Sequence, residues 1–176
     1  MEMKAEEFAK REAFEKVYRD YFASIYNYIF FRVGNHTDAE DLTADVFLRA
    51  YEYMDSFDNN KGVMRAWLGG IARNRVNTHL RKKMVRPHTV ELSVLTEPLR
   101  ADVSIEEEYQ QKETTDALLS QIRKLPKQQQ EFLTLKYFLG ITNRDIAKAL
   151  DMSESNVGVT LYRINEKLRK ELSDIV

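Results

Sequence analysis

The sequence has no cysteine, which excludes disulfides, thiolate metal ligands and cysteine nucleophiles and suits a reducing cytosol. It also has almost no net charge, because 27 lysines and arginines oppose 28 aspartates and glutamates. The chain as a whole therefore has no attraction to nucleic acid or to a membrane surface. Any such attraction must come from charges that are segregated on one part of it.

Long apolar runs are missing as well. The most apolar stretch, YFASIYNYIFF over 21–31, contains polar residues and is followed by Arg32, so it falls short of the roughly 18 apolar residues of a membrane span. The first residues, MEMKAEEFAKRE, lack the apolar centre of a signal peptide. We therefore expect a cytoplasmic protein, and its 43% of hydrophobic residues is enough for one or two packed cores.

The sequence also lacks the patterns of catalytic and cofactor sites. The three histidines, His36, His79 and His88, show no metal-ligand spacing, and there is no glycine-rich phosphate loop or nucleophile elbow. Neighbouring carboxylates such as Glu40 and Asp41 fall at the expected start of a helix, where the helix dipole accounts for them. We expect no catalytic residue, no metal, no cofactor and no enzymatic activity.

What is present in the first half is helical periodicity. Apolar residues recur at three- and four-residue steps up to Gly34, which predicts one face of a long helix, made of Phe14, Val17, Tyr18, Tyr21, Phe22, Ile25, Ile29 and Val33. A second helix is predicted from Thr37, which forms a capping-box pattern with Glu40, to Met54. Its predicted buried stripe is Leu42, Val46, Phe47, Ala50 and Met54. An exposed loop over 57–62 then precedes a third helix, with Trp67, Leu68, Ile71, Val76 and Leu80 on its inner face.

The periodicity weakens after Met84 and returns at Leu118. Pro87 and Pro98 interrupt the intervening stretch, and we interpret 87–114 as a flexible linker. Neither half shows a strand pattern or an internal repeat. The expected fold is all-α, with two small helical domains over 1–86 and 115–176, the second of which is a helix-turn-helix.

Local signals specify this helix-turn-helix. Thr142 with Asp145 predicts the start of a short helix, and Ser153 predicts the start of the next. Asp151 falls in the turn between them, where a short polar residue tolerates a left-handed backbone. In the last helix Val157, Leu161, Ile164 and Leu168 are predicted to face the core, and the outward face is Ser155, Asn156, Val159, Thr160, Arg163 and Lys167. Such a face suits the major groove, although a plain helical hairpin has the same spacing.

Two charged surfaces are expected in the first domain. The third helix region has seven basic residues and no acid among them, namely Arg65, Arg73, Arg75, Arg81, Lys82, Lys83 and Arg86. This segregation favours contact with phosphates, although a solvated face is the alternative. On the second helix, Asp38, Asp41, Asp45 and Glu52 surround Leu48, which is a reasonable anchor for a basic protein partner.

Uncharged side chains within the basic run fit nucleic acid as well. Asn74, Asn77 and Thr78 can hydrogen-bond to base edges, and Tyr53, Phe57 and Trp67 could stack on unpaired bases. The spacing of Trp67 with Leu68 and Ile71, however, favours a position in the core.

Three segments together resemble one family. DAEDLTADVFLRAY (38–51), WLGGIARNRVNTHLRKK (67–83) and LTLKYFLGITNRDIAKALDMSESNVGVTLYRINEKLR (133–169) resemble the extracytoplasmic-function group of sigma factors in the sigma-70 family. The resemblance implies a subunit that directs core RNA polymerase to promoters and stabilises the melted minus-ten strand. RNA synthesis would be left to the polymerase.

The resemblance also implies roles for individual residues. A coiled coil of the largest polymerase subunit would be bound by Asp38, Asp41, Asp45, Phe47, Leu48 and Glu52. Minus-ten DNA would be bound by Asn59, Asn60, Lys61, Arg65, Arg73, Asn74, Asn77 and Arg81. The minus-35 duplex would be bound by Arg144, Ser155, Asn156, Thr160, Arg163 and Lys167. The second domain would also contact the polymerase flap region, and an anti-sigma factor could be a further partner.

Some positions depart from the family pattern, and other functions are compatible with the sequence. Family members often carry lysine or arginine where this chain has Gly158 and Thr160, and aspartate where it has Thr78, so the promoter sequence stays open. A helix-turn-helix regulator that does not join the polymerase is one alternative, and a protein-interaction module is another. The sequence further predicts that reversing Asp41 and Asp45 to lysine abolishes polymerase binding and leaves the fold intact.

Overall fold

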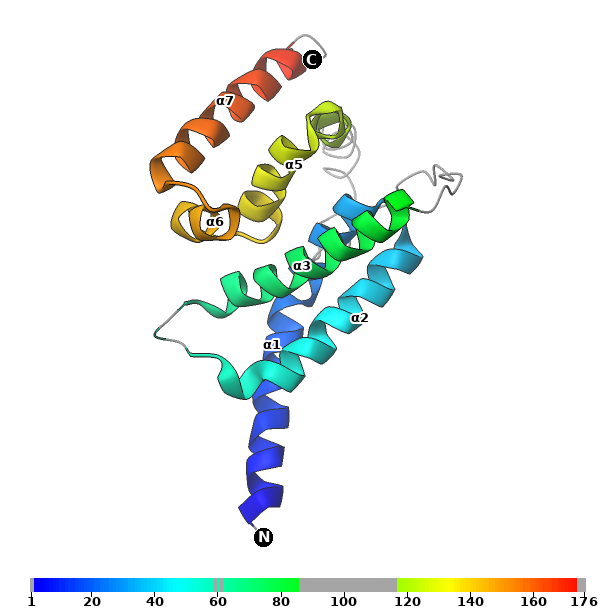
Figure 1. Cartoon of the computed structure of the whole chain (residues 1–176), viewed down its shortest axis with the longest axis vertical. Helices are drawn as coiled ribbons and strands as arrows, with labels where there is room; N and C mark the ends of the chain where they lie inside the picture. Colours follow the sequence, from blue (N-terminus) through cyan, green and yellow to red (C-terminus); the bar gives the residue numbers. More distant parts are fainter. Residues whose placement is uncertain (1, 59, 61, 86–116, 174–176) are drawn as a thin grey trace, which may run out of the picture. The chain divides into compact units, whose positions relative to one another are not determined.

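The computed structural model describes residues 2–58, 60, 62–85 and 117–173 (Figure 1). Within these residues the secondary structure is helical and contains no β-strand, which confirms the predicted fold class. Two compact units are present, Met1–Leu99 and Arg100–Val176. The first contains α1, α2, η1 and α3, and the second contains α5, η2, α6 and α7. The expected linker at 87–114 lies outside the described residues.

Helix α1 (Glu2–Val33) is the centre of the first unit and contacts both α2 and α3. As predicted, it ends at Gly34, whose positive φ of 81° is a conformation that glycine adopts without strain. Of the predicted stripe, Ile25 and Ile29 are buried, Tyr18 is 43% exposed and the other members are half-buried. The last turns also bury Tyr26, Tyr28, Phe30 and Phe31. A helix that two neighbours cover needs apolar residues on more than one side, and this is why a single stripe did not describe it.

Helix α2 (His36–Tyr53) begins earlier than predicted. Its N-cap is Asn35, whose side-chain oxygen accepts from the Asp38 N–H at 2.8 Å while its amide nitrogen donates to the Asp38 carboxylate at 2.7 Å. The predicted pairing of Thr37 with Glu40 is therefore wrong. Asparagine is at least as good an N-cap as threonine, and the turn at Gly34 places it directly before the helix.

The core of the first unit is aromatic where α1 meets α2. The ring of Phe47 lies 4.7 Å from that of Tyr18 and 6.2 Å from that of Phe22, and Phe47 is only 3% exposed. Burying one such side chain stabilises a fold by about 1.5–3 kcal/mol. Phe47 is therefore a core residue, as the periodicity of α2 predicts, and the polymerase contact that the resemblance implies for it stays a prediction.

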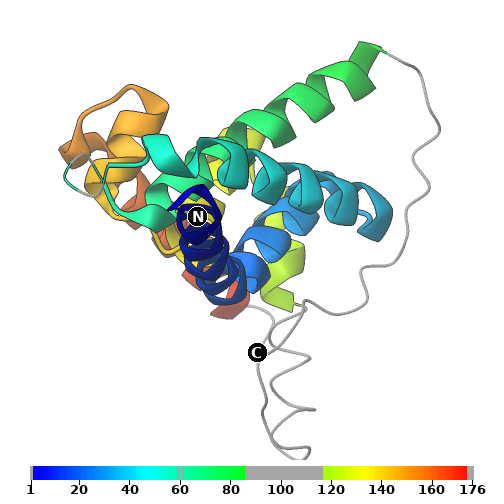
Figure 2. The same ribbon diagram turned by 90° about the horizontal axis from the view of Figure 1, so that it is seen from below.

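Helix α3 (Met64–Val85) completes this unit after the short 3-10 helix η1 (Met54–Ser56). Leu68, Ala72 and Val76 on α3 are fully buried. Trp67 is half-buried and its ring lies 5.2 Å from that of Phe57, so the predicted core position is only partly correct. Figure 1 shows α1, α2 and α3 packed against one another, with the first turns of α1 extending past the other two, and Figure 2 shows α1 nearly end-on from its N-terminus.

The second unit begins with a helical stretch over 117–124, followed by α5 (Lys127–Leu133). Gln130 is buried, and its amide nitrogen donates to the carbonyls of Arg123 and Leu125 at 2.9 and 2.8 Å. These carbonyls lie at a helix end, where no backbone donor is available. The sequence did not predict η2 (Thr134–Phe138), a π-helical turn that continues α5 up to Leu139.

Asp38 on α2 contacts two side chains of α3. Its carboxylate accepts from Lys83 Nζ at 3.1 Å and lies 3.3 Å from His79 Nε2. Partial burial by itself raises the pKa of Asp38, but the hydrogen bonds from Asn35 and Lys83 and the charges of His79 and Lys83 outweigh it, so the pKa is lowered. A carboxyl group with a lowered pKa in the folded state stabilises the fold above its unfolded pKa of about 3.9 and loses this contribution as the pH falls through the folded value.

We therefore expect Asp38→Asn to lower the free energy of unfolding at pH 7 and to flatten its decline below about pH 4. Urea denaturation between pH 3 and pH 7 measures both effects. Fluorescence of Trp67, the single tryptophan of the chain, follows the first unit. Asp41→Asn removes the same charge from an exposed position of α2 and serves as control. Equal pH profiles for the two variants would contradict the role of Asp38.

Candidate nucleic-acid and protein interfaces

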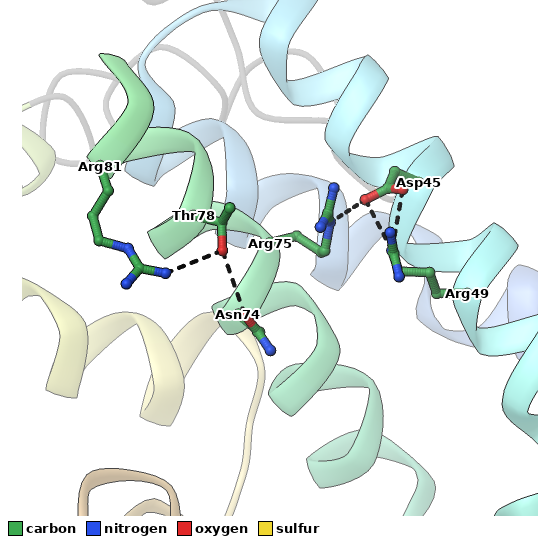
Figure 3. A network of polar contacts seen from close by, with 6 residues as sticks. All are labelled: Asp45, Arg49, Asn74, Arg75, Thr78 and Arg81. Carbon is green, nitrogen blue, oxygen red and sulfur yellow. Dashed lines mark hydrogen bonds and ion pairs between the residues drawn. The ribbon is translucent and has the colours of Figure 1, made fainter. Parts of the chain in front are cut away.

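The basic run on α3 divides into two faces. Arg75, His79 and Lys83 are spaced by four residues and face α2. The Arg75 guanidinium pairs with Asp45, which also accepts from Arg49 Nε at 3.2 Å (Figure 3). Arg75 and Lys83 are paired with carboxylates of α2 within the unit, so these two cations add little to a phosphate-binding surface.

The other face of α3 is polar and open. The Thr78 hydroxyl donates to the Asn74 side-chain oxygen at 3.5 Å and accepts from Arg81 Nη2 at 3.4 Å. Figure 3 shows these three side chains together, away from the pair of Arg75 with Asp45. Asn74 and Arg81 are exposed. One turn before Asn74, Gly70 is exposed and has open space where a side chain would stand, so this position extends the accessible surface, which the sequence did not indicate.

The remaining candidates for minus-ten contact are spread around this face. Arg65 is exposed, with its guanidinium 5.7 Å from the centre of the Tyr21 ring, and Asn60 is exposed in the loop. Arg73 is half-buried. Asn77 is half-buried and accepts a hydrogen bond from Arg32 Nη2 at 3.1 Å, so it supports the contact of α1 with α3 instead of the open face. Asn59 and Lys61 lie outside the described residues.

The acidic set on α2 divides in the same way. Leu48 is 58% exposed, and Asp41 and Glu52 are exposed near it on the helix. Asp38 and Asp45 instead face α3, where they bind its cations. The sequence expectation that all four carboxylates line one free surface is therefore corrected, because packing against α3 engages two of them.

This division changes the expected effect of charge reversal. Asp45→Lys places a third cation beside Arg49 and Arg75, and we expect it to lower the free energy of unfolding by roughly 1–2 kcal/mol. Asp41→Lys, the matched reversal at an exposed position, should change it by less than about 0.5 kcal/mol. Urea denaturation followed by Trp67 fluorescence tests both. Equal stability of the two variants would show that the pair of Asp45 with Arg75 does not hold α2 to α3.

In the second unit the helix-turn-helix has the caps that the sequence predicts. Helix α6 (Asn143–Leu150) begins at Thr142, whose hydroxyl accepts from the Asp145 N–H at 3.2 Å. Asp151 ends it in the left-handed region at φ 53°. The Ser153 hydroxyl then accepts from the Asn156 N–H at 3.2 Å, at the start of α7 (Glu154–Ser173).

The two faces of α7 also lie as predicted. Val157, Leu161, Ile164 and Leu168 are buried. Ser155, Asn156, Arg163 and Lys167 are exposed, Thr160 is half-buried, and Arg144 is exposed on α6. Tyr162, which is 67% exposed, also belongs to the outer face and was not predicted. Its spacing from Val159 on the outer face was the available signal.

Among the described residues, no group of three or more histidine, aspartate and glutamate side chains is placed to hold a metal ion. No helix in the described part of the chain has both the length and the apolar character that crossing a membrane requires. The open faces of α2, α3 and α7 consist of polar and charged side chains with a few exposed apolar ones.

Comparisons with protein families match the two units separately. The family model described as Sigma-70 region 2 matches residues 17–85, which include α2, η1 and α3. The model described as "Sigma-70, region 4" matches residues 115–168, which include the helix-turn-helix.

Curated relatives match along both units. BldN of Streptomyces coelicolor, an ECF RNA polymerase sigma factor, is 32% identical over 163 residues, which are 93% of this chain and 61% of BldN. The chain thus spans less than two thirds of the length of that relative. SigW of Bacillus subtilis, also an ECF RNA polymerase sigma factor, is 28% identical over 172 residues, which are 94% of this chain and 91% of SigW.

Solved structures share the fold. The sigma factor RpoE of Bartonella quintana, solved with the anti-sigma factor NepR, gives a TM-score of 0.68 at 21% identity and covers 92% of this chain and 98% of its own. CnrH, solved with the cytosolic domain of CnrY, gives a TM-score of 0.65 at 20% identity and covers 93% of this chain and 90% of its own.

Proposed function

Because this chain belongs to the extracytoplasmic-function group of the sigma-70 family, we propose that it directs core RNA polymerase to specific promoters and stabilises their melted minus-ten strand. The observation that carries the proposal is the pair of family regions, each folded as a helical unit with an exposed face that suits its task. The chain binds and positions DNA, and the polymerase catalyses RNA synthesis. A protein that binds core RNA polymerase and promoter DNA would act in the bacterial cytoplasm.

The contact with core polymerase is assigned to the exposed side of α2. There Leu48 is an apolar side chain beside the exposed carboxylates of Asp41 and Glu52. An apolar anchor that a charged rim surrounds is the usual arrangement of an interface centre. The coiled coil of the largest subunit is the proposed partner. An anti-sigma partner, which the resemblance allows, stays a prediction.

The contact with melted minus-ten DNA is assigned to the open face of α3. Asn74 and Thr78 offer hydrogen bonds to base edges, and Arg81 offers a charge to the backbone phosphates. Removing a base from its stack costs a few kcal/mol, which contacts to the unpaired base must offset. Arg65 and Asn60 lie at the start of this helix and in the preceding loop, where they can extend the track for a single strand.

The contact with the minus-35 duplex is assigned to α7, with Arg144 on α6. Of the exposed cations of α7, Arg163 and Lys167 belong to the predicted reading face, and so few phosphate contacts give weak, salt-sensitive affinity for duplex DNA. Attachment to the polymerase, including the flap region, would raise the effective concentration of this unit at the promoter.

Run-off transcription with purified core polymerase tests the proposal. Initiation from a promoter fragment only when the full chain is added supports it. Duplex binding without initiation would instead favour a regulator that does not join the polymerase. Asp41→Lys should lower co-purification with core at least tenfold, and Asp20→Lys, an exposed reversal on α1, is the control. Unchanged co-purification of Asp41→Lys would contradict the assignment of the α2 surface.

We also expect Asn74→Ala to lower open-complex formation about tenfold, the loss of roughly one specific contact, while polymerase binding changes less than twofold. Permanganate reactivity of unpaired thymines measures strand opening, and co-purification measures binding. Asn77→Ala is the matched variant, and its loss of the Arg32 contact should reduce stability of the unit. Equal losses of Asn74→Ala in opening and binding would contradict its contact with the melted strand.

A further inference from the structure

The outer face of α7 carries apolar side chains that the core does not use. Val159 is 44% exposed and Tyr162 is 67% exposed, and their three-residue spacing places them side by side on one face. Ser155, one turn before Val159, and Arg163, one turn after it, are exposed as well. Val159 therefore lies in the middle of the surface that a helix-turn-helix presents to the major groove.

The side chains from Glu154 to Tyr162 have little chemistry for guanine, whereas Arg163, one turn after Val159, can pair with it. Between Glu154 and Tyr162 the helix has no lysine or arginine, and these are the residues that pair most often with guanine O6 and N7. Asn156 is exposed, and its amide can pair with adenine N6 and N7. Thymine presents a 5-methyl group in the same groove, which apolar side chains contact. The first turns of α7 thus favour A·T base pairs.

Gly158, next to Val159, is half-buried. A Cβ added there would meet only the Asn143 side-chain nitrogen, at 3.8 Å, an ordinary contact distance. Packing within the unit therefore does not require glycine at this position.

We propose that Val159 selects thymine in the minus-35 duplex by contact with its 5-methyl group, and that Tyr162 extends this apolar surface. The inference rests on the proposed function, because it names the base that α7 recognises within a promoter. Val159 acts as a specificity-determining residue. The exposed Asn156 can recognise an adenine one turn earlier on the same surface.

The experiment uses the full chain assembled with core polymerase. A pool of duplex templates with a randomised segment in the minus-35 region is selected by holoenzyme binding, and the selected sequence is synthesised again with deoxyuridine in place of each thymine in turn. Deoxyuridine keeps every hydrogen-bonding group and lacks only the methyl group. At one thymine we expect holoenzyme binding to fall about fourfold, the value for removing one buried methyl group from contact.

Variants of Val159 connect this loss to the side chain. Val159→Ala should weaken binding to the thymine duplex by a similar factor and should show less than a twofold further loss with deoxyuridine. Val159→Thr keeps a methyl group and should keep the sensitivity to deoxyuridine. Circular dichroism checks that both variants remain helical, as expected for a position that is exposed on the helix surface.

Two results would overturn the inference. One is a selected segment without a preferred thymine, and the other is equal sensitivity of wild type and Val159→Ala to deoxyuridine at every position. In either case, run-off transcription that depends on the chain would still support the proposed function. Loss of transcription from all selected templates would count against the proposed function itself.

Discussion

The ion pairs between α2 and α3 determine which charges of the first unit are available to partners. Asp45 binds Arg75, and Asp38 binds Lys83 and lies beside His79. Each pair neutralises one carboxylate that would otherwise add to the acidic surface of α2 and one cation that would otherwise add to the surface of α3. What stays exposed is an acidic and apolar surface on α2 around Leu48 and a polar face on α3 around Asn74. Two interfaces of different character can therefore lie on adjacent helices.

In the second unit, backbone geometry and not ion pairing determines the exposed face of α7. The hydroxyls of Thr142 and Ser153 fix where α6 and α7 begin, and the left-handed residue Asp151 fixes where α6 ends. The buried stripe of α7 then fixes which face points outward. The outer face of α7 has few cations. In the proposed complex we therefore expect selectivity to come from contacts with base edges and methyl groups. Most of the binding free energy would come from the polymerase.

Sequence reasoning predicted what local chemistry determines. Helical periodicity gave the buried stripes, and the hydroxyls of Thr142 and Ser153 gave the helix starts in the second unit, because a cap acts within three residues. It could not show that Asp45 and Arg75, which are 30 residues apart, face each other, since that depends on how two helices cross. The same periodicity placed Phe47 in the buried stripe of α2, but it could not show that the rings covering it come from α1.

Asp38 takes part in two structures at once. It completes the N-terminal cap of α2 through Asn35, and it receives Lys83 from the far end of α3. The first turn of α2 and its attachment to α3 are thus thermodynamically coupled, so neither forms at full strength without the other. Because one carboxylate serves both purposes, fraying of the first turn of α2 weakens its attachment to α3, the helix that carries the open polar face around Asn74.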